Sequence, residues 1–282
     1  MSMAEKTENT DQQLIFGSPE EWKDFENRHP LFFERFPHLR QALHTAFLRM
    51  GETAEPIDRF VFFYGRLCCE DFFEVLLCCG NGRGAAALKL LRTLYERAVT
   101  LRYLHEHPDE LPAFWDFHHV QEYKLLVAIE ETFGKGKVSE KTASDLKARY
   151  DAVKDTFKVP LCDKCGTNRV NHSWSKLNFV AMSRKTGSLG ELAVPAYYIP
   201  MKHAHATAGS MYSRLEQTPK GVAFDASAQR GLADRAFVAA HNIILQVLGV
   251  QGDQFSIPGL SEQIGACIQD FQDIHRKQEP AV

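Results

Sequence analysis

The feature that most limits the fold of this chain is one uninterrupted helical pattern from residue 84 to residue 107. The stretch reads GAAALKLLRTLYERAVTLRYLHEH, and no Gly, Pro or Asn follows Gly84 to end a helix before Pro108. On a helical wheel the polar side chains fall in one stripe, and the opposite face is apolar, formed by Leu90, Leu91, Leu94, Tyr95, Ala98 and Leu101. The pattern predicts one long amphipathic helix.

The glycine-rich GNGRG segment before this helix has a second interpretation. A dinucleotide-binding unit places such a turn between a strand and a helix, here with Gly80, Gly82 and Ala85 beneath a pyrophosphate and Glu106 at a ribose. That unit also requires a second strand beginning near Val99, and nothing in the sequence stops the helix before it. We therefore predict that GNGRG is a plain loop between two long helices.

The rest of the chain predicts an all-α fold. Helical periodicity recurs over about 19–28, 38–50, 56–79, 84–107, 109–132, 138–157, 175–186, 191–206, 225–249 and 259–277. Strand-like alternation is nearly absent, and turn residues separate the helical segments. We predict a single helical bundle-like domain over 19–282, with a disordered polar tail at 1–18 and one long loop, KVPLCDKCGTNRVN, that carries a CxxC.

Composition narrows the class of protein. The chain has 33 Lys and Arg residues against 36 Asp and Glu, so its net charge of -3 does not indicate nucleic acid as a partner. The most apolar stretch, 60–79, contains Arg66, Glu70, Asp71 and Glu74, too many charges for a membrane span. The polar N-terminus lacks a signal-peptide pattern, and the odd count of seven cysteines favours reduced thiols. We expect a cytoplasmic protein with no membrane partner.

Two blocks of the sequence resemble a known family. GNGRGAAALKLLRTLYERAVTLRYLHEHPDE, with Arg92 and Glu96 followed by a Tyr-Leu pair, is similar to the signature helix of an uncharacterised bacterial all-helical family, domain of unknown function 5677. HSWSKLNFVAMSRKTG and AYYIPMKHAHATAGSM resemble its later pattern of a Trp-Ser pair, a Met-Ala helix, a tyrosine-rich helix and a His beside a small hydroxyl residue. The resemblance covers about 80–215 and implies an all-α fold but no activity. Pro200 and Met201 replace the Ser that the family tends to have before its His, and the CxxC loop is an addition.

The working hypothesis for function is binding of a ligand or partner in a polar cleft. Arg92 and Glu96 lie one helical turn apart at the edge of the apolar face, where an ordinary ion pair would also explain them. A guanidinium at such an edge offers a rigid fork of donors to an anionic or planar ligand. The tyrosine-rich helix carries Tyr198 and His205. We predict a cleft between these two helices that uses all four residues.

The sharpest local signal for a cofactor is LCDKCG, because a CxxC followed by Gly is the shape of a zinc knuckle. Cys162 and Cys165 would supply half of a tetrahedral site, His172 is the candidate third ligand, and His203, His205 or a partner subunit could complete it. Two free thiols in a surface loop are the other interpretation. No cofactor is certain, and a zinc-stabilised interaction module is one alternative function.

The other alternative rests on a short resemblance to the HEPN ribonucleases, metal-independent enzymes marked by an Arg followed after four to six residues by His. Arg102 with His107 and Arg235 with His241 fit this spacing, but chance alone predicts roughly two such matches in a chain of this composition. Arg102 would hold a scissile phosphate and His107 would act as acid or base, in phage defence or as a toxin. Whether the protein is an enzyme stays open, and we expect it to form homo-oligomers through apolar helix faces.

Overall fold

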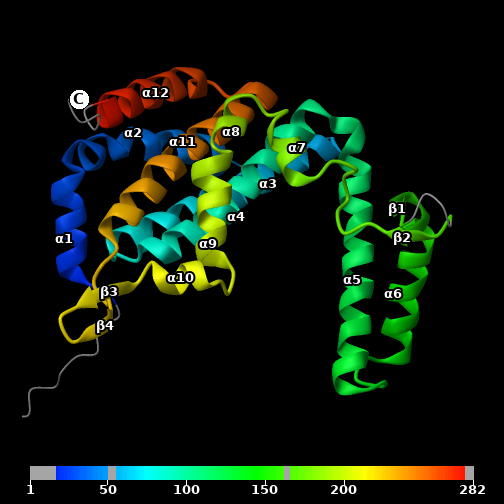
Figure 1. The fold of residues 1–282 in the computed structure, drawn as a ribbon. Helices are drawn as coiled ribbons and strands as arrows, with labels where there is room; N and C mark the ends of the chain where they lie inside the picture. Colours follow the sequence, from blue (N-terminus) through cyan, green and yellow to red (C-terminus); the bar gives the residue numbers. More distant parts are fainter. Residues whose placement is uncertain (1–16, 50–54, 162–165, 277–282) are drawn as a thin grey trace, which may run out of the picture.

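The computed structural model describes residues 17–49, 55–161 and 166–276, and these fold mostly as helices (Figure 1). The predicted all-α, bundle-like class is confirmed. Of the polar tail predicted at 1–18, only Gly17 and Ser18 are described. Cys162 and Cys165 of the predicted CxxC loop lie outside the described residues.

Three long helices form the centre of the fold: α3 (Pro56–Gly80), α4 (Gly84–Glu106) and α11 (Arg230–Gln254). Most of the apolar face predicted for α4 lies in the core, with exposed fractions of 1% or less for Leu91, Leu94, Tyr95, Ala98 and Leu101. Leu90, also predicted on this face, is partly buried at the edge of the core. Burial of this stripe supplies most of the stability of the helix, because in proteins helical stability comes mainly from packing of an amphipathic face and less from helix propensity. Across the described ranges, no helix combines the length and apolarity that crossing a bilayer requires.

Shorter helices cover this centre (Figure 1). Three come from the two ends of the chain: α1 (Pro19–Arg28), α2 (Pro30–Phe47) and α12 (Leu260–Arg276). The others follow one another along α4: α7 (Phe179–Ser183), α8 (Ser188–Glu191), the π-helical turn η3 (Val194–Tyr198) and α9 (Ile199–Ala204), and α10 (Ala208–Tyr212) packs against α9. This second group brings the predicted tyrosine/histidine segment against α4.

A helical arm leaves the central bundle after Pro108 (Figure 1). Its elements are the 3₁₀ turn η1 (Pro108–Glu110), α5 (Leu111–Phe133), α6 (Glu140–Val153) and the 3₁₀ turn η2 (Lys154–Phe157). Phe117, Val120 and Phe157 form a small core of its own. Trp174 packs against both this small core and the main one, so it links the arm to the bundle.

Two short antiparallel hairpins interrupt the helices, and sequence reasoning did not predict them. In one, β1 (Lys158–Pro160) pairs with β2 (Asn168–Val170). In the other, β3 (Leu215–Thr218) pairs with β4 (Gly221–Phe224), with Leu215 opposite Phe224. The strands are three or four residues long and lie in turn-rich sequence, too short to give the alternation by which strands are recognised.

Several predicted helix bounds were wrong, mainly at prolines. Helix α2 begins at Pro30 and not at residue 38, because a proline is well tolerated in the first turn, and Pro37 is accommodated inside the helix. The helix predicted over 191–206 is divided into η3 and α9, since Pro200 has no amide hydrogen to continue the α-helical ladder. The segment predicted at 175–186 contains only the short α7.

The glycine-rich loop is a tight turn between two helices, as predicted. Gly82 has a positive φ of 65°, in the left-handed region that favours glycine. A Cβ atom on Gly84 would lie 2.4 Å from the carbonyl oxygen of Gln229, and one on Gly80 would lie 2.5 Å from the Trp22 ring. These glycines therefore permit close packing of α4 against α11 and of α3 against α1, and no strand flanks them as a dinucleotide-binding unit would require.

Candidate functional site

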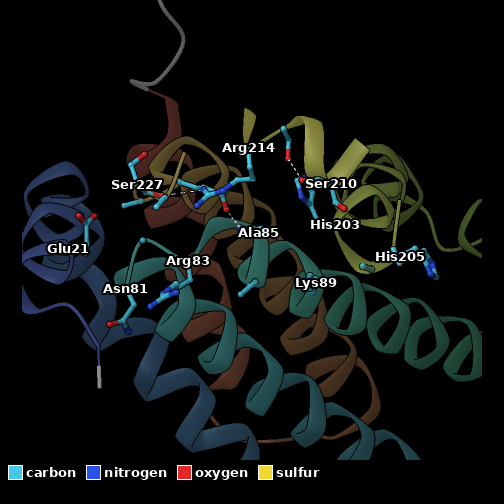
Figure 2. A pocket seen from close by; sticks show the side chains of 18 residues that line it. Glu21, Asn81, Arg83, Ala85, Lys89, His203, His205, Ser210, Arg214 and Ser227 are labelled. Atoms are coloured by element: carbon cyan, nitrogen blue, oxygen red, sulfur yellow. Dashed lines mark hydrogen bonds between the residues drawn. The ribbon is translucent and has the colours of Figure 1, made fainter. Parts of the chain in front are cut away.

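A polar cavity of about 730 Å³ opens where α4 begins (Figure 2). Its volume is in the range of small-molecule binding sites. Four parts of the chain surround it, and the lining residues are Glu21, Asn81, Gly82, Arg83, Ala85, Ala86, Lys89, His203, Ala204, His205, Ala206, Ser210, Ser213, Arg214, Ala226, Ser227, Ala228 and Gln229.

The charge of this lining is strongly positive. Arg83 from the α3–α4 turn, Lys89 from α4 and Arg214 from the segment before β3 carry full charges. Within the described part of the chain, Glu21 is the only acidic side chain in the lining. Both of its carboxylate oxygens already accept hydrogen bonds from Arg230, at 2.9 and 3.0 Å. The cavity is therefore suited to an anion.

The backbone at the start of α4 adds to this potential. The N–H of Ala85 donates to Oε1 of Gln229 at 3.1 Å, whereas the N–H of Ala86 is not hydrogen-bonded to another described residue. The first amides of a helix have no acceptor in the helix itself, and the aligned peptide dipoles make this end partly positive. The 23-residue helix α4 thus presents amide donors beside Arg83 and Lys89.

The β3–β4 hairpin fixes Arg214 at the cavity. Its guanidinium donates to the carbonyl oxygen of Ser227 at 3.2 Å, shown as a dashed line in Figure 2. The same guanidinium lies 5.2 Å from the centre of the Phe224 ring, in β4. These two contacts hold the charge in place while leaving the other donors of the guanidinium for a ligand.

His203 contributes a half-buried imidazole at the end of α9. Burial lowers the pKa of His203, and the positive charges of Lys89 and Lys202 lower it further. The ring is therefore mainly neutral at pH 7. An anion bound beside it would offset these charges and favour the protonated form.

Three of the four residues predicted for the polar cleft are in contact, next to this cavity. Arg92 donates from Nε to Glu96 Oε1 at 2.8 Å and from Nη1 to His205 Nε2 at 2.9 Å. Since a guanidinium only donates, the neutral His205 ring accepts at Nε2 and carries its hydrogen on Nδ1. The guanidinium lies 4.7 Å from the ring centre of Tyr197, whereas Tyr198 is 46% exposed and packs edge-on against Tyr197.

The two residues of the ribonuclease hypothesis have different partners. Arg102 donates to Glu106 at 2.6 Å and to Asp253 at 3.2 Å. His107 Nδ1 lies 3.0 Å from the carbonyl oxygen of Tyr103, and its ring is stacked on the Tyr103 ring at 4.3 Å. The contacts in the structure satisfy each side chain separately and do not bring the two together.

The zinc prediction is only partly covered by the described residues, since Cys162 and Cys165 lie outside them. His172 is exposed, and its Nε2 atom lies 3.3 Å from Nη1 of Arg169. Among the described residues, no group of three or more His, Cys, Asp or Glu side chains is placed to hold a metal ion. Zinc binding at the CxxC stays a prediction.

Sequence reasoning missed the three positively charged residues of the cavity. Arg83 lies in the glycine-rich turn directly before a helix, which is a signal for anion binding at a helix N-terminus. Lys89 is one polar residue of the helix predicted over 84–107, and Arg214 is 131 positions beyond Arg83 with no motif around it. Only the folded structure brings these side chains together.

Comparison with known proteins identifies a family but no characterised relative. No curated protein and no solved structure matches this chain. A family model described as a family of unknown function, DUF5677, matches residues 59–222, which is more than half of the 282 residues. The matched stretch includes Arg83, Lys89, His203 and Arg214 of the cavity. The comparison shows no link to the HEPN ribonucleases. The resemblance of the two sequence blocks to the uncharacterised helical family is confirmed, and the chain belongs to the family of unknown function DUF5677.

Proposed function

We propose that this protein binds a small ligand bearing a phosphate or a similar anionic group in the cavity at the start of α4. The observation that carries the proposal is the convergence of Arg83, Lys89 and Arg214 with the amide end of a long helix. Phosphate oxygens accept hydrogen bonds from both kinds of donor. A single acidic lining residue, already paired with Arg230, leaves this positive charge available.

The residues beside the cavity support a ligand that is larger than the anionic group alone. His205 lines the cavity and also accepts a hydrogen bond from Arg92. The Arg92 guanidinium, stacked on Tyr197, offers a flat polar surface that suits a planar group. We therefore extend the ligand class to phosphorylated molecules with a planar part, such as a nucleotide, with the phosphate at Arg83 and Lys89.

Isothermal titration calorimetry tests the proposal, with pyrophosphate and adenosine monophosphate as probes. Each should bind the wild-type protein saturably at one site per chain. Lys89→Met and Arg83→Gln should each weaken binding about tenfold, because a hydrogen bond to a charged group contributes roughly 1.5–3 kcal/mol. Arg92→Gln should weaken adenosine monophosphate more than pyrophosphate.

Matched control variants separate a specific site from general charge. Lys135 lies in the exposed turn after α5, and Arg40 is an exposed residue of α2, both outside the cavity lining. Lys135→Met and Arg40→Gln should leave the affinities unchanged. Absence of saturable binding of either probe, or an equal loss in the control variants, would contradict the proposal.

The ribonuclease alternative has no contact that favours it among the described residues. Arg102 is held by Glu106 and Asp253, and His107 is stacked on Tyr103. A phosphate positioned by Arg102 would have to compete with two carboxylates for the same guanidinium. RNA cleavage by the wild-type protein that is lost in both Arg102→Ala and His107→Ala, with folding intact, would nevertheless place this function first.

A further inference from the structure

We infer that a second site, between α3 and α5, binds a small organic anion with a flat apolar body. The site is a cavity of about 850 Å³, separate from the one at the start of α4. Its walls come from α3, from α5 and from the segment after β2. The volume is that of a small-molecule pocket.

The walls of this cavity are a connected set of aromatic rings. Phe60 is stacked with Tyr64 at 4.8 Å between ring centres and meets Phe114 edge-on at 5.3 Å. Trp115 is perpendicular to Phe60 at 6.1 Å, and Trp174 is perpendicular to Phe114 at 5.5 Å. Such edge-to-face contacts fix the rings relative to one another, so that the pocket is formed before a ligand enters.

Part of this aromatic surface is exposed to water. Trp115 is 49% exposed and Phe63, on the same cavity, is 57% exposed. Covering this apolar surface with a ligand is favourable in proportion to the area removed from water. A flat ring system fits the space between perpendicular walls, because aromatic pairs prefer stacked or edge-to-face contacts.

The charged and polar side chains at the rim determine which sign of charge a ligand can carry. Among the described lining residues, Arg59 is the only side chain with a full charge at neutral pH, and no carboxylate lines the cavity. His118 lies at the rim, and its Nε2 atom is 3.4 Å from Oε1 of Glu122. Burial raises the pKa of Tyr64 to about 12, so its hydroxyl remains a donor. A carboxylate or sulfonate fits these donors, and a cation does not.

The cavity lies between the central bundle and the helical arm, so a bound ligand would contact both. Trp174 packs against both the main core and the small core of the helical arm. Phe60 belongs to α3 of the bundle, whereas Phe114 and Trp115 belong to α5 of the arm. A ligand in the cavity would therefore contact both parts and stabilise their contact.

Titration with 1-naphthoate tests the inference, with calorimetry for stoichiometry and tryptophan fluorescence for location. Two of the three tryptophans, Trp115 and Trp174, line the cavity, whereas Trp22 belongs to α1. One molecule of 1-naphthoate should bind per chain and quench the fluorescence. 1-Naphthalenemethanol and 1-naphthylmethylammonium present the same ring without the negative charge, and they should bind at least tenfold more weakly.

Variants separate the charge from the apolar wall. Arg59→Gln should weaken 1-naphthoate about tenfold and leave 1-naphthalenemethanol unchanged, whereas Trp115→Ala should weaken both. Arg40→Gln and Phe133→Ala, at exposed positions outside the cavity, should change neither. Thermal unfolding of each variant confirms that the fold is retained, which the exposure of Arg59 and Trp115 favours.

Three results would overturn the inference. The first is equal affinity for the anionic, neutral and cationic naphthalenes, and the second is the same loss of affinity in the control variants. The third is a dimer in size-exclusion chromatography that Trp115→Ala dissociates and 1-naphthoate does not, because a second copy of the chain would then occupy the aromatic surface. None of these outcomes concerns the cavity at α4.

Discussion

A pair of histidines, one buried and one half-buried, shows how the surroundings set the chemistry of single residues. His241 is 2% exposed, and its Nδ1 atom lies 3.2 Å from Nε2 of His275. Burial lowers the pKa of His241 to about 3 and that of His275 to about 4. Among the nearby groups, His275 lowers the pKa of His241 and Asp270 raises it, whereas His29 lowers the pKa of His275. Both rings are neutral at pH 7.

This pair predicts that the protein loses stability in mild acid. An unfolded histidine has a pKa near 6.5, so the unfolded chain gains protons between about pH 6.5 and 4 that the folded His241 and His275 do not. The free energy of unfolding should therefore fall by roughly 1.4 kcal/mol per pH unit for each histidine in this range. Urea unfolding at pH 7, 6 and 5 measures the slope, and a His241→Leu, His275→Leu double variant should show a smaller one.

The comparison with the double variant is needed because protonation of Asp71 raises the free energy of unfolding in mild acid, whereas the two histidines lower it. Burial raises the pKa of Asp71 to about 6 despite its hydrogen bond to Arg97. The folded state therefore holds a proton on Asp71 that the unfolded state lacks between about pH 6 and 3.9, and this contribution to stability grows as the pH falls. It is common to both proteins, so parallel pH curves for the wild type and the double variant would contradict the assignment to the histidines.

At the scale of elements, the contact between α4 and α11 depends on the absence of a side chain at Gly84. A Cβ atom there would lie 2.4 Å from Gln229 O and 2.6 Å from Leu232 Cβ, and backbone atoms cannot move aside as a flexible side chain can. Gly84→Ala should reduce the free energy of unfolding by about 1–3 kcal/mol through overpacking. Gly249→Ala, in α11 with nothing within 4 Å, should instead raise it by up to about 1 kcal/mol.

Urea denaturation of the two alanine variants measures this difference. The same substitution in two helices separates close packing from helix propensity, because propensity alone favours alanine over glycine in both. Equal stabilisation by both substitutions would mean that α4 and α11 separate without cost at Gly84.

The sequence predicts elements well where local signals agree. Helix α4 was expected over 84–107 and ends at Glu106, because its apolar stripe and the following Pro108 give the same boundary. The sequence predicts helix bounds poorly at residues such as proline, which can either lie inside a helix or interrupt it. Pro37 lies inside α2, whereas Pro200 follows a π-helical turn, and only the surrounding packing distinguishes these cases.

In the candidate site, contacts within one helix could be predicted from the sequence, whereas contacts between distant parts of the chain could not. Arg92 and Glu96 are four residues apart on one helix, so their contact could be predicted from spacing alone. Tyr197, and not the predicted Tyr198, lies against the Arg92 guanidinium, and both tyrosines belong to the π-helical turn η3, which the sequence did not predict. Contacts across the chain, such as that between Arg214 and Ser227 beside α4, have no local signal.

At the scale of the whole molecule, two cores of unequal size determine how stability is distributed. The main core joins the central helices with those from both chain ends, whereas three buried residues hold the arm: Phe117, Val120 and Phe157. Helix α6 has no buried residue of its own. The arm should therefore open locally at a lower free energy than the bundle. Formation of homo-oligomers stays a prediction, and sedimentation analysis of the full chain tests it.

The unequal cores predict a selective effect of Phe157→Ala. Phe157 is 4% exposed and meets Phe117 edge-on at 5.1 Å, and removing a buried phenylalanine side chain costs roughly 3–5 kcal/mol. Hydrogen exchange followed by mass spectrometry should show faster exchange in α6 and unchanged protection in α4 and α11. Phe133→Ala, at a position that is 65% exposed, should leave all three helices unchanged. Because the main core contains none of the three arm residues, a uniform loss of protection in α4 and α11 would mean that arm and bundle unfold as one cooperative unit.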